Sequence, residues 1–197
     1  MDKFFGPYKF DYKQYILERY NLLESPARIR DIEYTKNDAL LNIGEATRVK
    51  NNDRLIGDYS YSSFVFDLYE SSEDDLVFYN LIDKKHPFIY LHHSVEPTTL
   101  DNLNGVISRD IWNWKSVNGL AWYWVFDYIL SNCEFIISDE VHTSKGEKFW
   151  KQLLDDAASK KLKCGAIKMK TNEIVPIDKF EDYYNEDKRN YQFIIFK

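Results

Sequence analysis

The chain has 197 residues, of which 44% are hydrophobic and 17% aromatic, a composition typical of a folded globular protein rather than a disordered one. The formal net charge of −6 argues against a general DNA- or RNA-binding protein, which carries a basic surface. The longest apolar run, Gly119 to Leu130, contains Asp127 and is too short to cross a membrane. We therefore expect one soluble domain, or one domain with an appendage.

Cysteine usage and the first residues favour the cytoplasm. Cys133 and Cys164 are far apart and show neither a disulfide framework nor zinc-ligand spacing, so we expect two small buried thiols in a reducing compartment. The segment Met1 to Pro7 breaks before an apolar core develops, so no signal peptide is expected. We predict a cytoplasmic protein that has no membrane partner.

Residues 1–60 are expected to form an N-terminal segment of helices and a strand, either within the same domain or as a separate partner-binding addition. Apolar residues recur at helical spacing over 12–23, and a proline follows shortly after. Residues 29–34 alternate as a short strand, and a second helix is expected over 39–46. The polar stretch 50–54 is typical of a loop.

Residues 61–197 are expected to form an α+β domain, and its first half has the pattern of an antiparallel meander. Runs rich in β-branched and aromatic residues are separated by short polar turns, which indicates strands joined by hairpins. The expected strands are residues 62–69, 76–82, 88–93 and 106–112, and the expected turns are 71–75 and 83–87.

The second half alternates between helix and strand. We expect a helix over 119–130, a strand over 133–138, a helix from Thr143 or Ser144 through Lys160, a hairpin of 165–169 with 173–177, and a final strand over 191–196. A meander followed by this alternation predicts a mixed, mostly antiparallel central sheet flanked by helices.

The turn before residue 120 has the composition of an anion-binding site. A strand there leads into a turn with small residues at a helix N-terminus, where unpaired N–H groups and the helix dipole favour a phosphate. Gly119 lets the backbone approach a ligand closely. The small side chain of Ala121 keeps the first helical turn from obstructing that ligand. The residues expected to bind the anion are Ser116, Val117, Asn118, Gly119, Leu120 and Ala121.

The order of elements over roughly residues 62–177, with Gly119 and Ala121 in that turn, resembles the GCN5-related N-acetyltransferase (GNAT) family. The family's pyrophosphate loop has the form Arg/Gln-x-x-Gly-x-Gly/Ala and binds acyl-coenzyme A through backbone amides. The matching window begins at Ser116, which stands at the leading position. The segment 138–150 is similar to divergent acyltransferase-like proteins of phages and mobile elements. The resemblance implies a GNAT-like fold, and transfer of an acyl group from acetyl-CoA or another acyl-CoA to a small-molecule or protein amine.

The resemblance also implies a carboxylate that deprotonates the acceptor amine. Asp110 lies on the expected fourth strand and Glu96 on the preceding segment, so either could be the general base. The other interpretation of each is an exposed or ion-paired carboxylate. Asp139 and His142 form an Asp-x-x-His pattern, which is either a capping turn or a polar cluster that relays a proton at the cleft.

No metal site is expected from the histidines, because His92 and His93 are adjacent on a strand and point to opposite faces. We expect one of them to pack inward and the other to meet solvent. Four tryptophans bracket the anion-binding turn and could be either core residues or the wall of an acceptor pocket: Trp112, Trp114, Trp122 and Trp124.

A second function is compatible with the same resemblance. Active family members often have a tyrosine on the later helix that protonates the departing thiolate, but no tyrosine lies between Thr143 and Lys163. Ser116 also replaces the usual Arg or Gln of the loop. The alternative is a catalytically degenerate GNAT-like binding protein, such as a phage inhibitor of a host defence or nucleic-acid enzyme.

Overall fold

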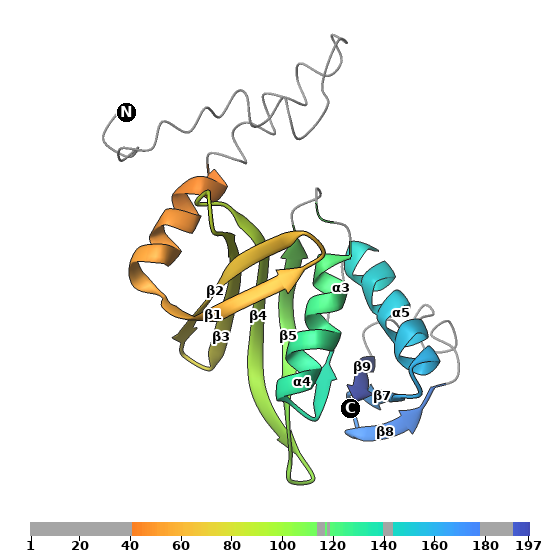
Figure 1. Ribbon diagram of the computed structural model, residues 1–197. Coiled ribbons are helices and arrows are strands. Elements are labelled where there is room, and N and C mark those ends of the chain that lie inside the picture. Colours follow the sequence, from red (N-terminus) through yellow and green to blue (C-terminus); the bar gives the residue numbers. More distant parts are fainter. Residues whose placement is uncertain (1–40, 114–116, 118, 140–143, 178–190) are drawn as a thin grey trace.

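The computed structural model describes residues 41–113, 117, 119–139, 144–177 and 191–197 (Figure 1). The helix predicted over 12–23 and the strand predicted over 29–34 lie outside these residues. The described residues form a mixed nine-stranded sheet, in the order β1-β2-β3-β4-β5-β6-β9-β7-β8, flanked by helices. The predicted α+β class with a mostly antiparallel sheet is therefore confirmed.

The first five strands form an antiparallel meander, as predicted. They are β1 Arg54–Tyr61, β2 Phe64–Glu73, β3 Leu76–Asp83, β4 Ile89–Leu100 and β5 Leu103–Asn113. The prediction missed β1, because this edge strand is largely exposed and has no clear apolar alternation. The predicted loop over 50–54 was wrong in part, since residues 41–52 are helical and β1 begins at Arg54.

The strand β4 is longer than predicted because it continues through a proline. Its pairing with β3 ends at Val95, whereas Pro97 still pairs with Val106 of β5. Proline has no backbone N–H and is tolerated in a sheet only where no ladder bond is needed. Pro97 meets this condition because β4 has already passed the end of its pairing with β3.

The second half follows the predicted alternation within a few residues. Its elements are the helix α3 Leu120–Trp124, the π-helical turn η1 Val125–Ile129, the helix α4 Leu130–Asn132, the strand β6 Phe135–Ile137, the helix α5 Ser144–Ser159, and the strands β7 Lys163–Lys168, β8 Glu173–Pro176 and β9 Tyr191–Phe196. The strands β5 and β6 are parallel, and the other neighbouring pairs in the sheet are antiparallel.

Helices cover both faces of the meander (Figure 1). Leu81 packs in the same buried cluster as Trp124 of α3, whereas its neighbour Ile82 packs with Ala46 and Val49 of the helix over residues 41–52. Successive side chains of a strand point to opposite faces, so these two helices lie on opposite sides of the sheet.

The strands of the second half are also packed on both faces. Ile136 belongs to the cluster that includes Leu153 of α5, whereas Phe135 and Ile137 form a separate cluster on the other face. Phe135 lies against Gly105 of β5, where a Cβ atom would come within 2.3 Å of the phenylalanine ring. Only glycine allows this close approach between β5 and β6.

Candidate functional site

The parallel strands β5 and β6 separate at their carboxyl ends. They pair only over Gly105–Ile107 and Phe135–Ile137, whereas β5 continues for six further residues, 108–113. The helix α3 follows β5 and the helix α5 follows β6, so both helices begin near this edge of the sheet (Figure 1). We call residues 108–113 together with Asp139 the β5–β6 opening.

A β-bulge places Arg109 at this opening. The register between β4 and β5 shifts between Ser94 and Val95, which makes Arg109 an extra residue on β5. Its guanidinium donates from Nε to Glu96 Oε2 at 2.8 Å and from Nη1 to Asp139 Oδ1 at 2.8 Å. Arg109 therefore joins β4, β5 and the second residue after the end of β6.

The charges in this group largely compensate one another. The side chains of Arg109, Glu96 and Asp139 are 31%, 32% and 32% exposed. The hydrogen bond to Glu96 raises the pKa of Arg109, and the bond to Asp139 acts in the same direction. Two carboxylates and one guanidinium leave a net charge of −1. An anionic ligand here would have to be held by backbone amides rather than by Arg109.

Hydrogen bonds to β9 position the end of β6. The Ser138 N–H donates to the Phe193 carbonyl oxygen at 2.8 Å, and the Phe193 N–H donates to Ser138 Oγ at 2.9 Å. Gln192 Nε2 also donates to the Ser138 carbonyl oxygen at 2.9 Å. These bonds hold the chain that carries Asp139 to β9 while it diverges from β5.

The start of α3 has the backbone that a close-approach turn requires. Gly119 is exposed and has φ of 77°, a left-handed conformation that favours glycine. A Cβ at this position would lie 3.0 Å from the Tyr61 hydroxyl. The Gly119 carbonyl accepts from the Tyr123 N–H at 2.9 Å, which starts the helix. A side chain at position 119 would therefore strain the turn and crowd the Tyr61 hydroxyl.

The predicted anion-binding residues are described only in part. Val117, Leu120 and Ala121 are buried at 3%, 0% and 6% exposure, so their side chains belong to the core. Any ligand contact by these three residues would therefore be made by their backbone. Ser116 and Asn118 lie outside the described residues.

The predicted catalytic residues fall into two groups. Glu96 and Asp139 come together through Arg109, although they are far apart in sequence. Asp110 is exposed and close enough to His92 for its charge to act on the histidine pKa. His142 lies outside the described residues. Sequence reasoning missed Arg109, because nothing in the local pattern shows that a bulge brings it between two carboxylates.

The adjacent histidines have different environments, as predicted. His93 is fully buried, accepts at Nδ1 from Trp124 Nε1 at 3.0 Å, and lies with Nε2 2.9 Å from Ser108 Oγ. An indole N–H is only a donor, so the proton of neutral His93 is on Nε2 and is donated to Ser108. Burial lowers the pKa of His93 to about 3. This histidine is a structural core group, and His92 is half-buried on the other face.

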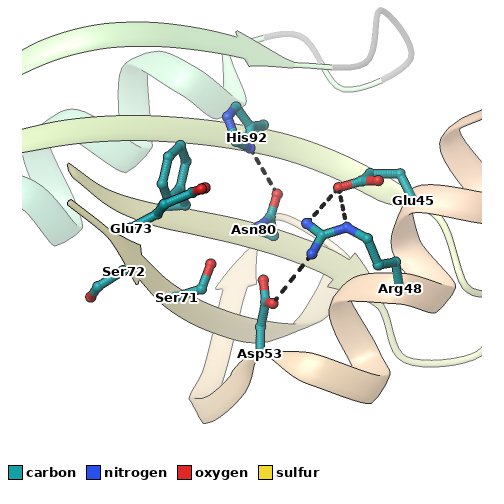
Figure 2. A pocket seen from close by; sticks show the side chains of 9 residues that line it. Glu45, Arg48, Asp53, Ser71, Ser72, Glu73, Asn80 and His92 are labelled. Carbon is teal, nitrogen blue, oxygen red and sulfur yellow. Dashed lines mark hydrogen bonds and ion pairs between the residues drawn. The ribbon is translucent and has the colours of Figure 1, made fainter.

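A pocket lies on the other face of the meander, beside the helix over residues 41–52 (Figure 2). Its volume is about 370 Å³. We call it the helix–sheet pocket, and its lining residues are Glu45, Arg48, Asp53, Ser71, Ser72, Glu73, Phe78, Asn80 and His92. The sequence did not reveal this pocket, because its residues come from a helix, the bend after it at Asp53 and three strands, which only the tertiary fold assembles.

One wall of the pocket carries an arginine between two carboxylates (Figure 2). Arg48 donates to Glu45 Oε1 from Nε at 2.9 Å and from Nη2 at 2.7 Å, and this hydrogen bonding lowers the pKa of Glu45. The Asp53 side chain is only 4% exposed, and its Oδ1 lies 3.9 Å from Arg48 Nη1. Among the described groups, Asp53 Oδ2 has no hydrogen-bond partner although it is buried.

The other wall carries His92 and Asn80. His92 Nδ1 lies 2.9 Å from Asn80 Oδ1, and the Asn80 side chain is buried. The amide oxygen is an acceptor, so His92 donates from Nδ1 and its Nε2 is left as an acceptor in the neutral ring. Burial lowers the pKa of His92, which favours that neutral form. The ring also stacks on Trp112, with centroids 5.8 Å apart.

The tryptophans do not share one role. Trp124 is fully buried in the core, whereas Trp112 is 38% exposed beside His92. Trp122 is partly buried, with the Lys160 ammonium 5.3 Å from its ring centroid. Trp114 lies outside the described residues. The bracket of tryptophans predicted around the turn therefore divides between core and surface.

Neither cysteine is poised as a nucleophile. Cys133 and Cys164 are free and partly buried, and burial raises the pKa of each thiol to about 11. Cys133 Sγ donates to the Ile129 carbonyl oxygen at 3.1 Å. Both thiols are protonated at neutral pH, which fits the structural role expected for Cys133.

Comparison with known proteins provides no family. No family model matches the chain, and no curated protein is significantly similar to it in sequence.

Within the described part of the chain, no three His, Cys, Asp or Glu side chains are grouped so that they could hold a metal ion. A search of the described helices finds none with the length and apolar character needed to cross a membrane.

Proposed function

We propose that the chain is an N-acyltransferase with a GNAT-like fold, which moves an acyl group from acyl-coenzyme A to an amine. The observation that carries the proposal is the β5–β6 opening. In open sheets, ligands bind outside the carboxyl ends of parallel strands, and helix N-termini favour phosphate groups. Here β5 and β6 separate beside the starts of α3 and α5.

The turn before α3 supports a coenzyme with a pyrophosphate. Gly119 has exposed backbone in a left-handed conformation, and the Tyr61 hydroxyl lies beside it, 3.0 Å from where a Cβ would stand. Backbone amides can hold a pyrophosphate without a basic side chain. The coenzyme-binding residues in this proposal are Ser116, Val117, Asn118, Gly119, Leu120 and Ala121.

The reaction requires a base and no covalent enzyme intermediate. The acceptor amine attacks the thioester carbonyl carbon, the C–S bond breaks, and coenzyme A leaves as the thiolate. Glu96 is the better-placed base, because Arg109 holds it in one cluster with Asp139, whereas Asp110 lies on the side of His92. In the resting protein Arg109 Nε donates to the Glu96 carboxylate, and in this proposal the carboxylate takes the amine proton when that contact loosens.

A specific observation favours the second candidate function. Glu96 and Asp139 are both ion-paired with Arg109, so both carboxylates are engaged with the guanidinium rather than with an acceptor amine. Together with the lack of a tyrosine between Thr143 and Lys163, this supports a degenerate GNAT-like binding protein that blocks a partner, as a phage inhibitor of a host enzyme would. The two free thiols support a reducing compartment, so we propose the cytoplasm for either function.

Binding of acetyl-CoA tests the proposed site. At a ligand concentration of about 100 times Kd, the free energy of unfolding should rise by about 2.7 kcal/mol, which corresponds to a rise in Tm of roughly 5–10 °C. Differential scanning fluorimetry with acetyl-CoA measures this shift, and pantetheine, which lacks the pyrophosphate, should give a much smaller one. Absence of any shift at millimolar acetyl-CoA would exclude this site and the enzyme.

Acyl transfer then separates the two functions. With acetyl-CoA and a panel of amines, we expect release of free coenzyme A thiol, measured with a chromogenic thiol reagent. Glu96→Gln should lower this rate by about 10²-fold or more while acetyl-CoA still raises Tm. The matched control is Glu173→Gln, which removes a surface ion pair with Lys168 far from the opening in sequence. Coenzyme binding without thiol release from any amine would favour the degenerate binding protein.

A further inference from the structure

The helix–sheet pocket holds a buried carboxylate whose hydrogen bonding is incomplete. The Asp53 side chain is 4% exposed, and its Oδ2 has no partner among the described groups. Figure 2 shows this side chain directed into the pocket, between Ser71 and the guanidinium of Arg48. Buried polar atoms in native proteins are almost always hydrogen-bonded, so an orphaned carboxylate oxygen in a cavity indicates a missing donor.

Arg48 does not supply that donor. Its Nε and Nη2 both donate to Glu45, and the 3.9 Å between its Nη1 and Asp53 Oδ1 is too long for a hydrogen bond. The Arg48 side chain is 55% exposed and comes from the pocket's rim. It can therefore move outward with Glu45 and open a path to Asp53 without disturbing the core.

Carboxylates predominate among the charged groups of the pocket, whereas the Ser71 and Ser72 hydroxyls and the Asn80 amide can also donate hydrogen bonds. Three carboxylates, on Glu45, Asp53 and Glu73, face the single guanidinium of Arg48, which gives a net charge of −2 when His92 is neutral. The unprotonated ring nitrogen of His92 is a further acceptor. A positively charged ligand that carries N–H donors would complement this excess of carboxylates.

We propose that the helix–sheet pocket binds a small organic cation, an aliphatic amine whose ammonium group donates to Asp53. Its volume of about 370 Å³ lies within the range of small-molecule sites. A metal ion is a poorer occupant, because the described residues contain no group of three or more metal ligands. The pocket shares none of the residues assigned to the coenzyme, so this site stands apart from the proposed acyl transfer.

Putrescine is the probe for this site, and isothermal titration calorimetry on the full chain measures its binding. We expect one molecule of putrescine to bind each chain. Its neutral isostere 1,4-butanediol should not bind, because it lacks the charge. Magnesium chloride at the same concentration tests whether any dication suffices. The proposal is overturned if putrescine does not bind, if magnesium competes with it on equal terms, or if butanediol binds as well as putrescine.

Variants locate the site. Asp53→Asn should weaken putrescine binding by about tenfold or more, because it removes a charge-assisted hydrogen bond. Asp75→Asn is the matched control. It removes the same charge as Asp53→Asn, but Asp75 is exposed in the turn between β2 and β3 and does not line the pocket. Glu73→Gln should weaken binding less, and its exposed position keeps the test valid even if Asp53→Asn does not fold. Equal affinity in all variants would overturn the assignment, and unchanged acetyl-CoA binding by Asp53→Asn would show that the two sites are separate.

Discussion

Two carboxylate clusters lie on this sheet, and they differ in how far their hydrogen bonding is completed. At the β5–β6 opening, Glu96 and Asp139 both receive hydrogen bonds from Arg109. In the helix–sheet pocket, Arg48 donates from Nε and Nη2 to Glu45, and Asp53 retains an oxygen with no hydrogen-bond partner among the described groups. The first cluster is complete as a structural unit, whereas the second lacks a donor.

This difference indicates which site would bind a ligand through side chains and which would bind it through the backbone. An unsatisfied buried acceptor costs about 1–3 kcal/mol, and a ligand that donates to it recovers that cost. At the opening no side chain has this deficit, so a ligand there must gain its affinity from backbone amides and from the helix N-termini. The pocket, in contrast, offers a side-chain charge directly.

The largest expected effect concerns His93, a buried group whose two ring nitrogens both have hydrogen-bond partners. The folded protein keeps His93 neutral down to about pH 3, whereas the unfolded chain binds a proton near pH 6.5. The free energy of unfolding should therefore fall as pH decreases through this window, by roughly 1.4 kcal/mol per pH unit. Urea denaturation at several pH values measures the slope. His93→Gln retains an acceptor and a donor but does not titrate, so its slope should be smaller by that amount, and an equal slope would show that His93 is not held neutral.

A smaller effect is expected from Arg109→Met. The substitution leaves Glu96 and Asp139 facing each other without a cation, and since all three groups are about a third exposed, the loss of stability should be roughly 1–2 kcal/mol. Urea denaturation at pH 7 measures it. Adding Glu96→Gln to Arg109→Met should recover part of the loss, because it removes the repulsion; no recovery would mean that Arg109 acts through packing alone.

The smallest effect is expected from Asp53→Asn. Because Asp53 has an incomplete hydrogen-bond set and only a distant ion pair, the neutral amide should change the free energy of unfolding by less than about 1 kcal/mol, in either direction. The same urea titration provides the comparison with Arg109→Met. If Asp53→Asn were the more damaging of the two, Asp53 would be a structural residue and the contrast between the clusters would fail.

Local patterns predicted most of the strands and helices of the described chain. The turns at residues 71–75 and 83–87 separate runs whose composition indicates strands, and the observed meander follows them, although β2 extends into the first turn. The edge strand β1 was missed because its exposed side chains lack alternation, and the extension of β4 was missed because Pro97 normally ends a strand.

The candidate sites were less predictable. Gly119 could be recognised because a small-residue turn before a helix has a sequence signature, and its left-handed conformation agrees with that reading. Glu96 and Asp139 were picked as carboxylates, but their shared partner Arg109 was not, since the partnership depends on a bulge in β5. Asp53 carries no signature at all.

The sequence by itself determined the class of fold, the antiparallel order of the first strands and the special turn at Gly119. These follow from periodicity and backbone preference, which act over a few neighbouring residues. Only the tertiary structure decided which charges meet. Arg109 reaches two carboxylates through strand register, and Asp53 is buried without a donor because the helix over residues 41–52 packs on the sheet at that point. Such pairings depend on distances across the fold, which no local pattern encodes.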